Sequence, residues 1–330
     1  MIKPKPVWLV ILWIMTSALL IFSSCHATNP AGIATPVVTT GLPAPGETSV
    51  SLQPAMVRDS IEGLPHQVIN PVDGGVMILI PPGEFIMGSE PSHPDAGANE
   101  IPPRRVYLGA YYIYKTEVTN QMFHQFARAT GHSSVRWDPA WALEYPRHPA
   151  TYITYPEAEA YCRWAGVTLP TEAQWEKAAR GTDGREYPWG NQWNPNWCNN
   201  VQTDDPQLLS MMAPIISGRG TLPVGSVQED RSPYGIMDMG GNINEWCLDY
   251  YSEDYYHRGN VNNPSGPESG MERVIRGGSW SLPARRSRCA SRWSGDVSSP
   301  LGEYGFRCVA GPDFIANMKK NSPGDTPVKE

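Results

Sequence analysis

Aromatic residues are concentrated in one part of this chain, and their distribution limits where a hydrophobic core can form. All 15 tyrosines and ten of the 12 tryptophans lie in residues 73–312. Residues 26–72 contain seven prolines, four charged side chains and no Trp, Tyr or Phe. Such a composition cannot bury enough apolar surface to fold. The sequence therefore predicts one domain over residues 73–312, a flexible tether over 25–72 and a disordered tail over 313–330.

The first 24 residues have the pattern of a lipoprotein signal peptide. Two lysines precede an apolar run over residues 7–22, and small residues lead to Cys25. The run is shorter than the ~20 residues that a membrane-spanning helix needs. Phe22-Ser23-Ser24-Cys25 resembles the bacterial lipobox, which predicts cleavage after residue 24 and lipid on Cys25. The alternative is an uncleaved anchor in which Cys25 is an ordinary buried thiol.

Lipidation implies an extracytoplasmic protein whose first partner is a bacterial membrane. Because one acyl chain binds a membrane only weakly, stable anchoring needs several chains on Cys25. His26 follows the cysteine, where an Asp would indicate retention at the inner membrane, so we expect the outer membrane, on its periplasmic or surface face. Removing residues 1–24 takes away two lysines and no acid, so the net charge changes from -7 to -9. This negative charge argues against a nucleic-acid partner.

Helix signals are few in the predicted domain. Residues 119–131, 156–166 and 171–181 each combine an N-terminal signal, apolar residues at helical spacing and a terminal glycine. The other apolar runs, such as 77–80 and 273–275, are short and are separated by Gly, Pro, Asn and Asp. The sequence therefore predicts an α+β domain with short strands, few helices and many loops.

Several strings along the domain are distinctive when they are taken in order. They are Pro82–Gly88, Lys115–Asn120, Ala160–Gly166, Leu169–Gly181, Tyr187–Gly190, Pro223–Gly225, Tyr234–Trp246, Arg273–Trp280 and Gly305–Cys308. Together they resemble the formylglycine-generating enzyme family, also called sulfatase-modifying factors. The resemblance covers residues 73–312 and implies the family's variant of the C-type lectin fold.

The resemblance also implies which chemistry is missing. The family's enzymes are copper-dependent oxidases that use O2 to convert a sulfatase cysteine to formylglycine. They need two nearby thiolates after a Gly-Gly-Ser motif, because Cu(I) is soft and prefers sulfur ligands. Here Leu282 takes the place of the first cysteine, and residues 284–286 hold no thiol where the second belongs. We therefore predict no copper cofactor, no catalytic residue of the usual kind and no standard oxidase activity.

The remaining cysteines are expected to stabilise the domain. Five lie beyond Cys25, and an odd number in an oxidising compartment leaves at least one thiol unpaired. The resemblance pairs Cys162 with Cys308; the alternative is two buried free thiols. The pairing of the other three, Cys198, Cys247 and Cys289, stays open.

The segment from Asp238 to Glu245 is the candidate ion site. Calcium takes six to eight oxygen ligands, and glycine-rich loops can direct carbonyls towards it. The resemblance implies structural calcium held by the side chains of Asp238 and Glu245 and by the carbonyls of Gly241 and Ile243. The alternative is a turn whose acids bond backbone amides.

Four residues after the Gly-Gly pair are candidates for lining the family's cleft: Ser279, Trp280, Arg285 and Arg286. An arginine there would bind a carboxylate, a phosphate or a peptide carbonyl, and Trp280 would form a floor. Alternatively, these arginines are solvated or pair with acids of the core. Arg292, in contrast, lies within a fold motif and is predicted to be structural, as is Arg307.

Three functions fit these features. The first is a membrane-anchored binding, accessory or assembly lipoprotein with a protein or peptide partner and no oxidase activity. The second is a periplasmic oxidative tailoring or protein-modifying enzyme with non-cysteine chemistry in the same cleft. The third is a lectin-like receptor, which the abundance of Arg and Ser in residues 279–304 disfavours. We favour the first, although the sequence leaves open whether any catalysis remains.

Overall fold

The computed structural model describes residues 61, 63–201 and 220–315. The predictions for the signal peptide, for Cys25 and for most of the tether lie outside the described residues, as does most of the predicted tail. Within the described ranges, no helix combines the length and the apolar character that crossing a membrane requires.

The strands form two four-stranded sheets and one two-stranded ribbon. The first sheet has the order β1-β2-β5-β10 and is antiparallel, with β1 at Gln67–Ile69, β2 at Val76–Ile80, β5 at Tyr111–Tyr114 and β10 at Val309–Ala310. The ribbon pairs β3, Gly83–Met87, with β4, Arg104–Leu108. The second sheet has the order β8-β7-β6-β9, with β6 at Asn244–Tyr250, β7 at Glu272–Arg276, β8 at Trp293–Asp296 and β9 at Tyr304–Gly305. The expected α+β class with short strands is confirmed.

The three helices that the sequence predicts are present. They are α2 at Asn120–Thr130, α4 at Tyr155–Ala165 and α5 at Glu172–Arg180. Each has a capping box at its start, and Gly131 and Gly166 end α2 and α4 in the left-handed conformation that favours glycine. Four short segments without a helical pattern in the sequence are also helical: η1 at Ala98–Glu100, α3 at Pro139–Glu144, α7 at Tyr255–Arg258 and η2 at Ala284–Ser287. They are too short to show a helical period.

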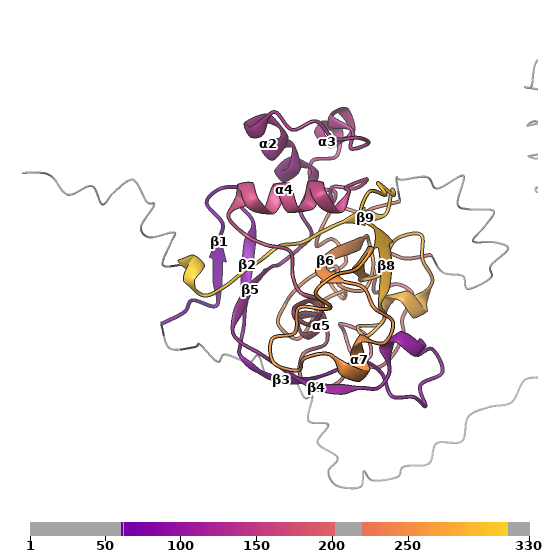
Figure 1. Cartoon of the computed structure of the whole chain (residues 1–330). Coiled ribbons are helices and arrows are strands. Elements are labelled where there is room, and N and C mark those ends of the chain that lie inside the picture. The colour runs from indigo at the N-terminus through magenta and orange to yellow at the C-terminus, as the bar shows by residue number, and fades with distance from the viewer. Residues whose placement is uncertain (1–60, 62, 202–219, 316–330) are drawn as a thin grey trace, which may run out of the picture. The chain divides into compact units, whose positions relative to one another are not determined.

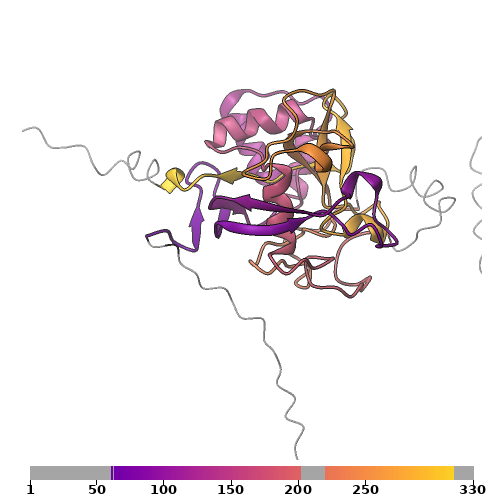
Figure 2. The same cartoon turned by 60° about the horizontal axis from the view of Figure 1, so that its bottom comes forward.

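The core lies on both faces of β5. Tyr112 and Tyr114 pack in one hydrophobic cluster with residues of α2 and α4. Tyr111 and Ile113 pack in a second cluster around Trp175 of α5. Successive strand residues point to opposite faces, so a strand with both faces covered is buried along its whole length. Figure 1 shows α2, α3 and α4 gathered at the top of the view and α5 among the strands below them. The helix α5 contacts the indigo strands β3 and β4 as well as β6 and β7 (Figure 2).

The folded region extends beyond residues 73–312. Strand β1 ends before Asp73 and is hydrogen-bonded to β2. Side chains on both sides of the predicted boundaries pack against the larger core cluster: Ile61, Leu64, Phe314 and Ile315. Isolated apolar residues among prolines do not reveal this packing in the sequence, because their partners lie far along the chain.

Buried arginine–carboxylate pairs connect the second sheet, and the segment between β7 and β8, to the rest of the domain. The pairs are Arg276 with Glu176, Arg288 with Glu100, Arg292 with Glu172 and Arg307 with Glu245. All eight residues are buried. The structural interpretation of Arg292 and Arg307 is thereby confirmed. Because each pair is desolvated, loss of one partner leaves an uncompensated buried charge.

Candidate functional site

The chain reverses direction directly after β7. Gly277 and Gly278 have φ angles of 100° and 71°, which strongly favour glycine. A Cβ on Gly278 would lie 3.0 Å from the backbone oxygen of Arg286, because η2 folds back against the turn. This close approach brings Leu282 and Arg286 to the same side of β7.

A cleft opens at this turn, and the space in it for water-sized molecules is about 90 Å3. Its side chains come from β6, from β7, from the segment between β7 and β8, from β8 and from the residues at β9: Asn244, Ile275, Arg276, Leu282, Arg286, Ser291, Trp293, Glu303 and Tyr304. Leu282, at the position where the resemblance predicts the family's first active cysteine, lines the cleft, and none of the described lining residues is a cysteine. The cleft therefore combines a mostly apolar surface with a few polar side chains, and its described lining has no thiol.

Of the four predicted cleft residues, the structure places only Arg286 in the lining. Ser279 is fully buried, and its hydroxyl lies 3.1 Å from that of Ser281. Trp280 is also buried, and a Cβ on Gly220 would clash with its ring. Arg285 is exposed and outside the lining. The turn at Gly277 and Gly278 explains why Ser279 and Trp280 are buried. The chain reaches the cleft again at Leu282.

The lining residues that sequence reasoning missed include Asn244, Trp293 and Glu303. These three belong to three segments that become neighbours only through the strand order β8-β7-β6-β9. Glu303 accepts a hydrogen bond of 2.6 Å from the hydroxyl of Ser281. No local spacing in the sequence indicates this convergence.

The carboxylate of Glu245 is already engaged by neighbouring donors. Nε and Nη2 of Arg307 each donate to it at 2.6 Å, and the indole of Trp175 donates at 2.9 Å. Asp238 has a positive φ of 58°, and its carboxylate accepts a 2.6 Å bond from the backbone N–H of Gly225. These contacts match the alternative in which the acids bond protein donors.

The buried acids around Arg307 nevertheless outnumber this one arginine, so an additional cation would be compatible with the site. Burial raises the pKa of Glu117, Asp230 and Asp238, and for Glu117 and Asp230 the charge of Asp238 adds to the effect. The pKa of Asp238 rises to about 6. One oxygen of Glu117, Oε1, is buried and has no hydrogen-bond partner in the described part of the chain. Hard oxygens with excess negative charge suit calcium, and Asp238 with Glu117 offers a better donor set than Glu245 does.

The cysteine sulfurs of Cys162 and Cys308 face each other at 3.5 Å, one from α4 and the other just before β10. Both are reduced and buried, as are Cys198, Cys247 and Cys289. A disulfide would require the two sulfurs to approach to ~2.05 Å. The disulfide therefore stays a prediction, and the two thiols that it needs are adjacent.

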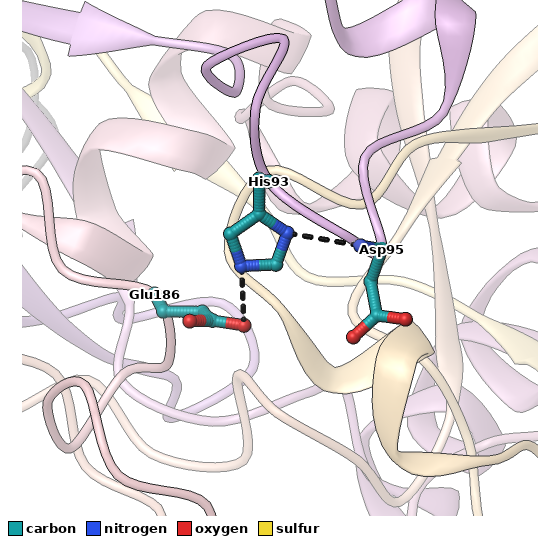
Figure 3. Close-up of side chains that lie close together, drawn as sticks. All are labelled: His93, Asp95 and Glu186. Carbon is teal, nitrogen blue, oxygen red and sulfur yellow. Dashed lines mark hydrogen bonds and ion pairs between the residues drawn. The ribbon is translucent and has the colours of Figure 1, made fainter.

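A second group of side chains, outside the cleft lining, has residue types that bind metals. His93, Asp95 and Glu186 present nitrogen and oxygen atoms within 4.8 Å of one another (Figure 3). Nδ1 of His93 accepts a 3.2 Å hydrogen bond from the N–H of Asp95, and Nε2 lies 3.1 Å from Oε1 of Glu186. The neutral ring therefore carries its proton on Nε2 and donates it to Glu186. Both ring nitrogens of His93 are therefore engaged in hydrogen bonds, and neither is available to bind a metal in this arrangement.

Known proteins share this fold and much of this sequence. The family described as sulfatase-modifying factor enzyme 1-like domain matches residues 65–312. A formylglycine-generating enzyme of Streptomyces coelicolor is 33% identical over 288 residues, covering 72% of this chain and 90% of the relative. The Bos taurus enzyme is 31% identical, covering 71% and 74%. Among solved structures, PvdO from Pseudomonas aeruginosa superimposes with a TM-score of 0.61 at 23% identity, covering 74% of this chain and 97% of PvdO. Treponema denticola variable protein 1 gives 0.55 at 20% identity, covering 75% and 99%. The chain therefore belongs to the sulfatase-modifying factor family.

Proposed function

We propose that this chain is an extracytoplasmic lipoprotein, held at a bacterial outer membrane through Cys25, whose domain binds a protein or peptide partner in its cleft. It acts as a binding or accessory component and does not perform copper–thiolate oxidation. The observation that supports this proposal is the lining of the cleft, which includes Leu282 and Arg286 and, among the described residues, no cysteine. The resemblance implies that the family's first active thiol would stand at Leu282 and the second within residues 284–286.

The nearby cysteine cannot replace the missing thiols. Cys289 follows η2 but is fully buried and lies outside the cleft lining. Burial raises the pKa of its thiol to about 12, so the thiol stays protonated at neutral pH. Cu(I) ligation requires the thiolate form.

Oxygen uptake provides a first test. The mature chain carrying Cys25→Ser would be mixed with Cu(I), a reductant and a sulfatase-type cysteine peptide in an oxygen electrode. Uptake should equal that of copper and peptide alone, whereas the Streptomyces coelicolor relative serves as the positive control. Uptake that scales with the concentration of this protein would contradict the proposal.

Anchoring is tested separately on the full chain in a bacterial host. The wild-type protein should fractionate with outer membranes, and its N-terminal peptide should carry the mass of several acyl chains. Cys25→Ser should release it into the soluble periplasmic fraction, whereas Cys198→Ser should stay membrane-bound. A wild-type protein that keeps residues 1–24 and has no acyl mass would refute lipidation.

We also propose a structural calcium ion held by Asp238 with the help of Glu117. The proposal is supported by the excess of buried carboxylates over the single Arg307 and by the unpaired oxygen of Glu117. The ion would neutralise these acids and would fix the loop that leads into β6.

A further inference from the structure

Arg286 differs from the other arginines around the cleft in having no acidic partner. Its guanidinium carbon lies 3.6 Å from the ring centre of Trp293, whose side chain is half exposed. In the part of the chain that the structure describes, no hydrogen bond or ion pair reaches the guanidinium. The neighbouring Arg288 is paired with Glu100 through two bonds of 2.8 Å, although its buried Nε has no hydrogen-bond partner among the described residues. Arg286 therefore offers unused hydrogen-bond donors to the cleft.

The surroundings of Arg286 favour the binding of an anion to its guanidinium. Burial lowers its pKa, and the positive charges of Arg285 and Arg288 lower it further; Glu100, which is bonded to Arg288 and not to Arg286, offsets only part of this effect. A half-buried guanidinium without a counter-ion lacks part of the hydration that it would have in water. A ligand carboxylate would restore charge balance through two parallel N–H···O bonds, while Trp293 keeps the guanidinium plane in position.

The other polar groups of the cleft restrict the type of anion. Glu303 also lines the cleft and is not paired with Arg286. Its charge opposes dianions such as phosphate, but it can accept N–H groups from a ligand. Asn244 and Ser291 add neutral donors and acceptors. A singly charged carboxylate on a peptide, which carries both an acid and amide N–H groups, matches this combination.

We propose that Arg286, supported by Trp293, is the anchor for an acidic side chain of a polypeptide ligand. This inference rests on the proposed binding function and specifies its ligand. The space of about 90 Å3 admits one side chain, not a folded peptide. The remainder of the ligand would therefore lie across the outside of the cleft, near Glu303.

The test uses the mature chain with Cys25→Ser, labelled with 5-fluorotryptophan. Trp293→Phe identifies the resonance of Trp293 in the fluorine spectrum. The probes are the peptides acetyl-Gly-Glu-Gly-amide and acetyl-Gly-Gln-Gly-amide. The glutamate peptide should shift the Trp293 resonance with a Kd at least tenfold lower than that of the glutamine peptide, which is ~1.4 kcal/mol.

Variants separate a direct contact from a general charge effect. Arg286→Gln should abolish the preference for glutamate, whereas the exposed Arg285→Gln should keep it. Unchanged resonances of the other tryptophans show that a variant is folded. Equal Kd values for the two peptides, the lack of any Trp293 shift, or a preference that survives in Arg286→Gln would each overturn the proposal.

The two proposals fail in different ways. Protein-dependent oxygen uptake together with an intact glutamate preference would refute the non-oxidase function and leave the Arg286 contact standing. A lost preference without uptake would refute only the contact.

Discussion

Replacing Asp238 with asparagine isolates the cost of a buried acid at the predicted ion site. Asp238 is 4% exposed, and burial raises its pKa from 3.8 to about 6. Because the folded state holds the proton more tightly than the unfolded state, stability falls as the pH rises from about 4 to above 6. Asparagine cannot ionise, yet its side-chain oxygen can still accept the N–H of Gly225.

The size of this effect follows from the pKa values. A rise from 3.8 to about 6 is worth about 3 kcal/mol, at ~1.4 kcal/mol per pKa unit. Without calcium, Asp238→Asn should therefore be more stable than the wild type at pH 8 by up to about 3 kcal/mol. The two proteins should be nearly equal at pH 4. For a domain of this size, the difference corresponds to roughly 6–12 °C in Tm.

Calcium should remove this advantage. An ion present at 100 times its Kd adds ~2.7 kcal/mol to the protein that binds it. Wild-type Tm should rise by several degrees when calcium replaces a chelator at pH 8, and Asp238→Asn should respond much less. Differential scanning calorimetry in chelator and in calcium, at pH 4, 6 and 8, measures all of these differences.

Two results would refute this reasoning. If Asp238→Asn is less stable than the wild type at pH 8 in chelator, the buried carboxylate stabilises the fold and its raised pKa is wrong. If calcium shifts neither protein, the ion site is absent. Asp296→Asn is the matched control: this residue lies on β8 and is exposed, so its substitution should give no gain at pH 8.

Three further predictions follow from buried contacts. Arg307→Met leaves its buried carboxylate partner without a counter-charge and should cost ~3–5 kcal/mol in urea unfolding, whereas Arg105→Met breaks only an exposed pair and should cost less than about 1 kcal/mol; similar values for both would contradict the account. Protein purified from an oxidising compartment should contain a bond between Cys162 and Cys308, whose reduction should lower stability by several kcal/mol through loss of the loop-closure constraint; peptide mapping that finds both thiols free would refute it. Gly278→Ala should lower Tm because a Cβ would lie 3.0 Å from a carbonyl oxygen of η2 at a φ of 71°, and an unchanged Tm would show that the turn relaxes freely.

The helices and the fold class could be predicted because their signals are local in the sequence. The capping residues Thr119 and Thr171 act on backbone N–H groups within three residues, so their effect is visible in a short window. The family could be identified from the short motifs along the domain, because each motif determines a local turn or packing contact. The predicted start at Asp73 was too late, since β1 is held by a partner strand and not by its own composition.

The candidate site depended on contacts that the sequence does not show. Arg285 and Arg286 are adjacent in sequence, yet only Arg286 lines the cleft, because η2 turns one side chain inward and leaves the other exposed. Trp293 and Glu303 reach the cleft through the order of the second sheet. The same limit applies to Arg307: Glu117, Asp238 and Glu245 lie beside it but far from it in the sequence, so the charge excess beside Asp238 was not predictable.

Conversion of a peptide cysteine is the most direct test of the central claim that this cleft does not oxidise thiols. The mature chain with Cys25→Ser would be incubated with Cu(I), O2 and a sulfatase-type peptide, and the cysteine would be followed by mass spectrometry. We predict that formylglycine does not exceed the amount formed with copper alone, while the Streptomyces coelicolor enzyme converts the same peptide. Formylglycine that accumulates over several turnovers of this protein would contradict the claim.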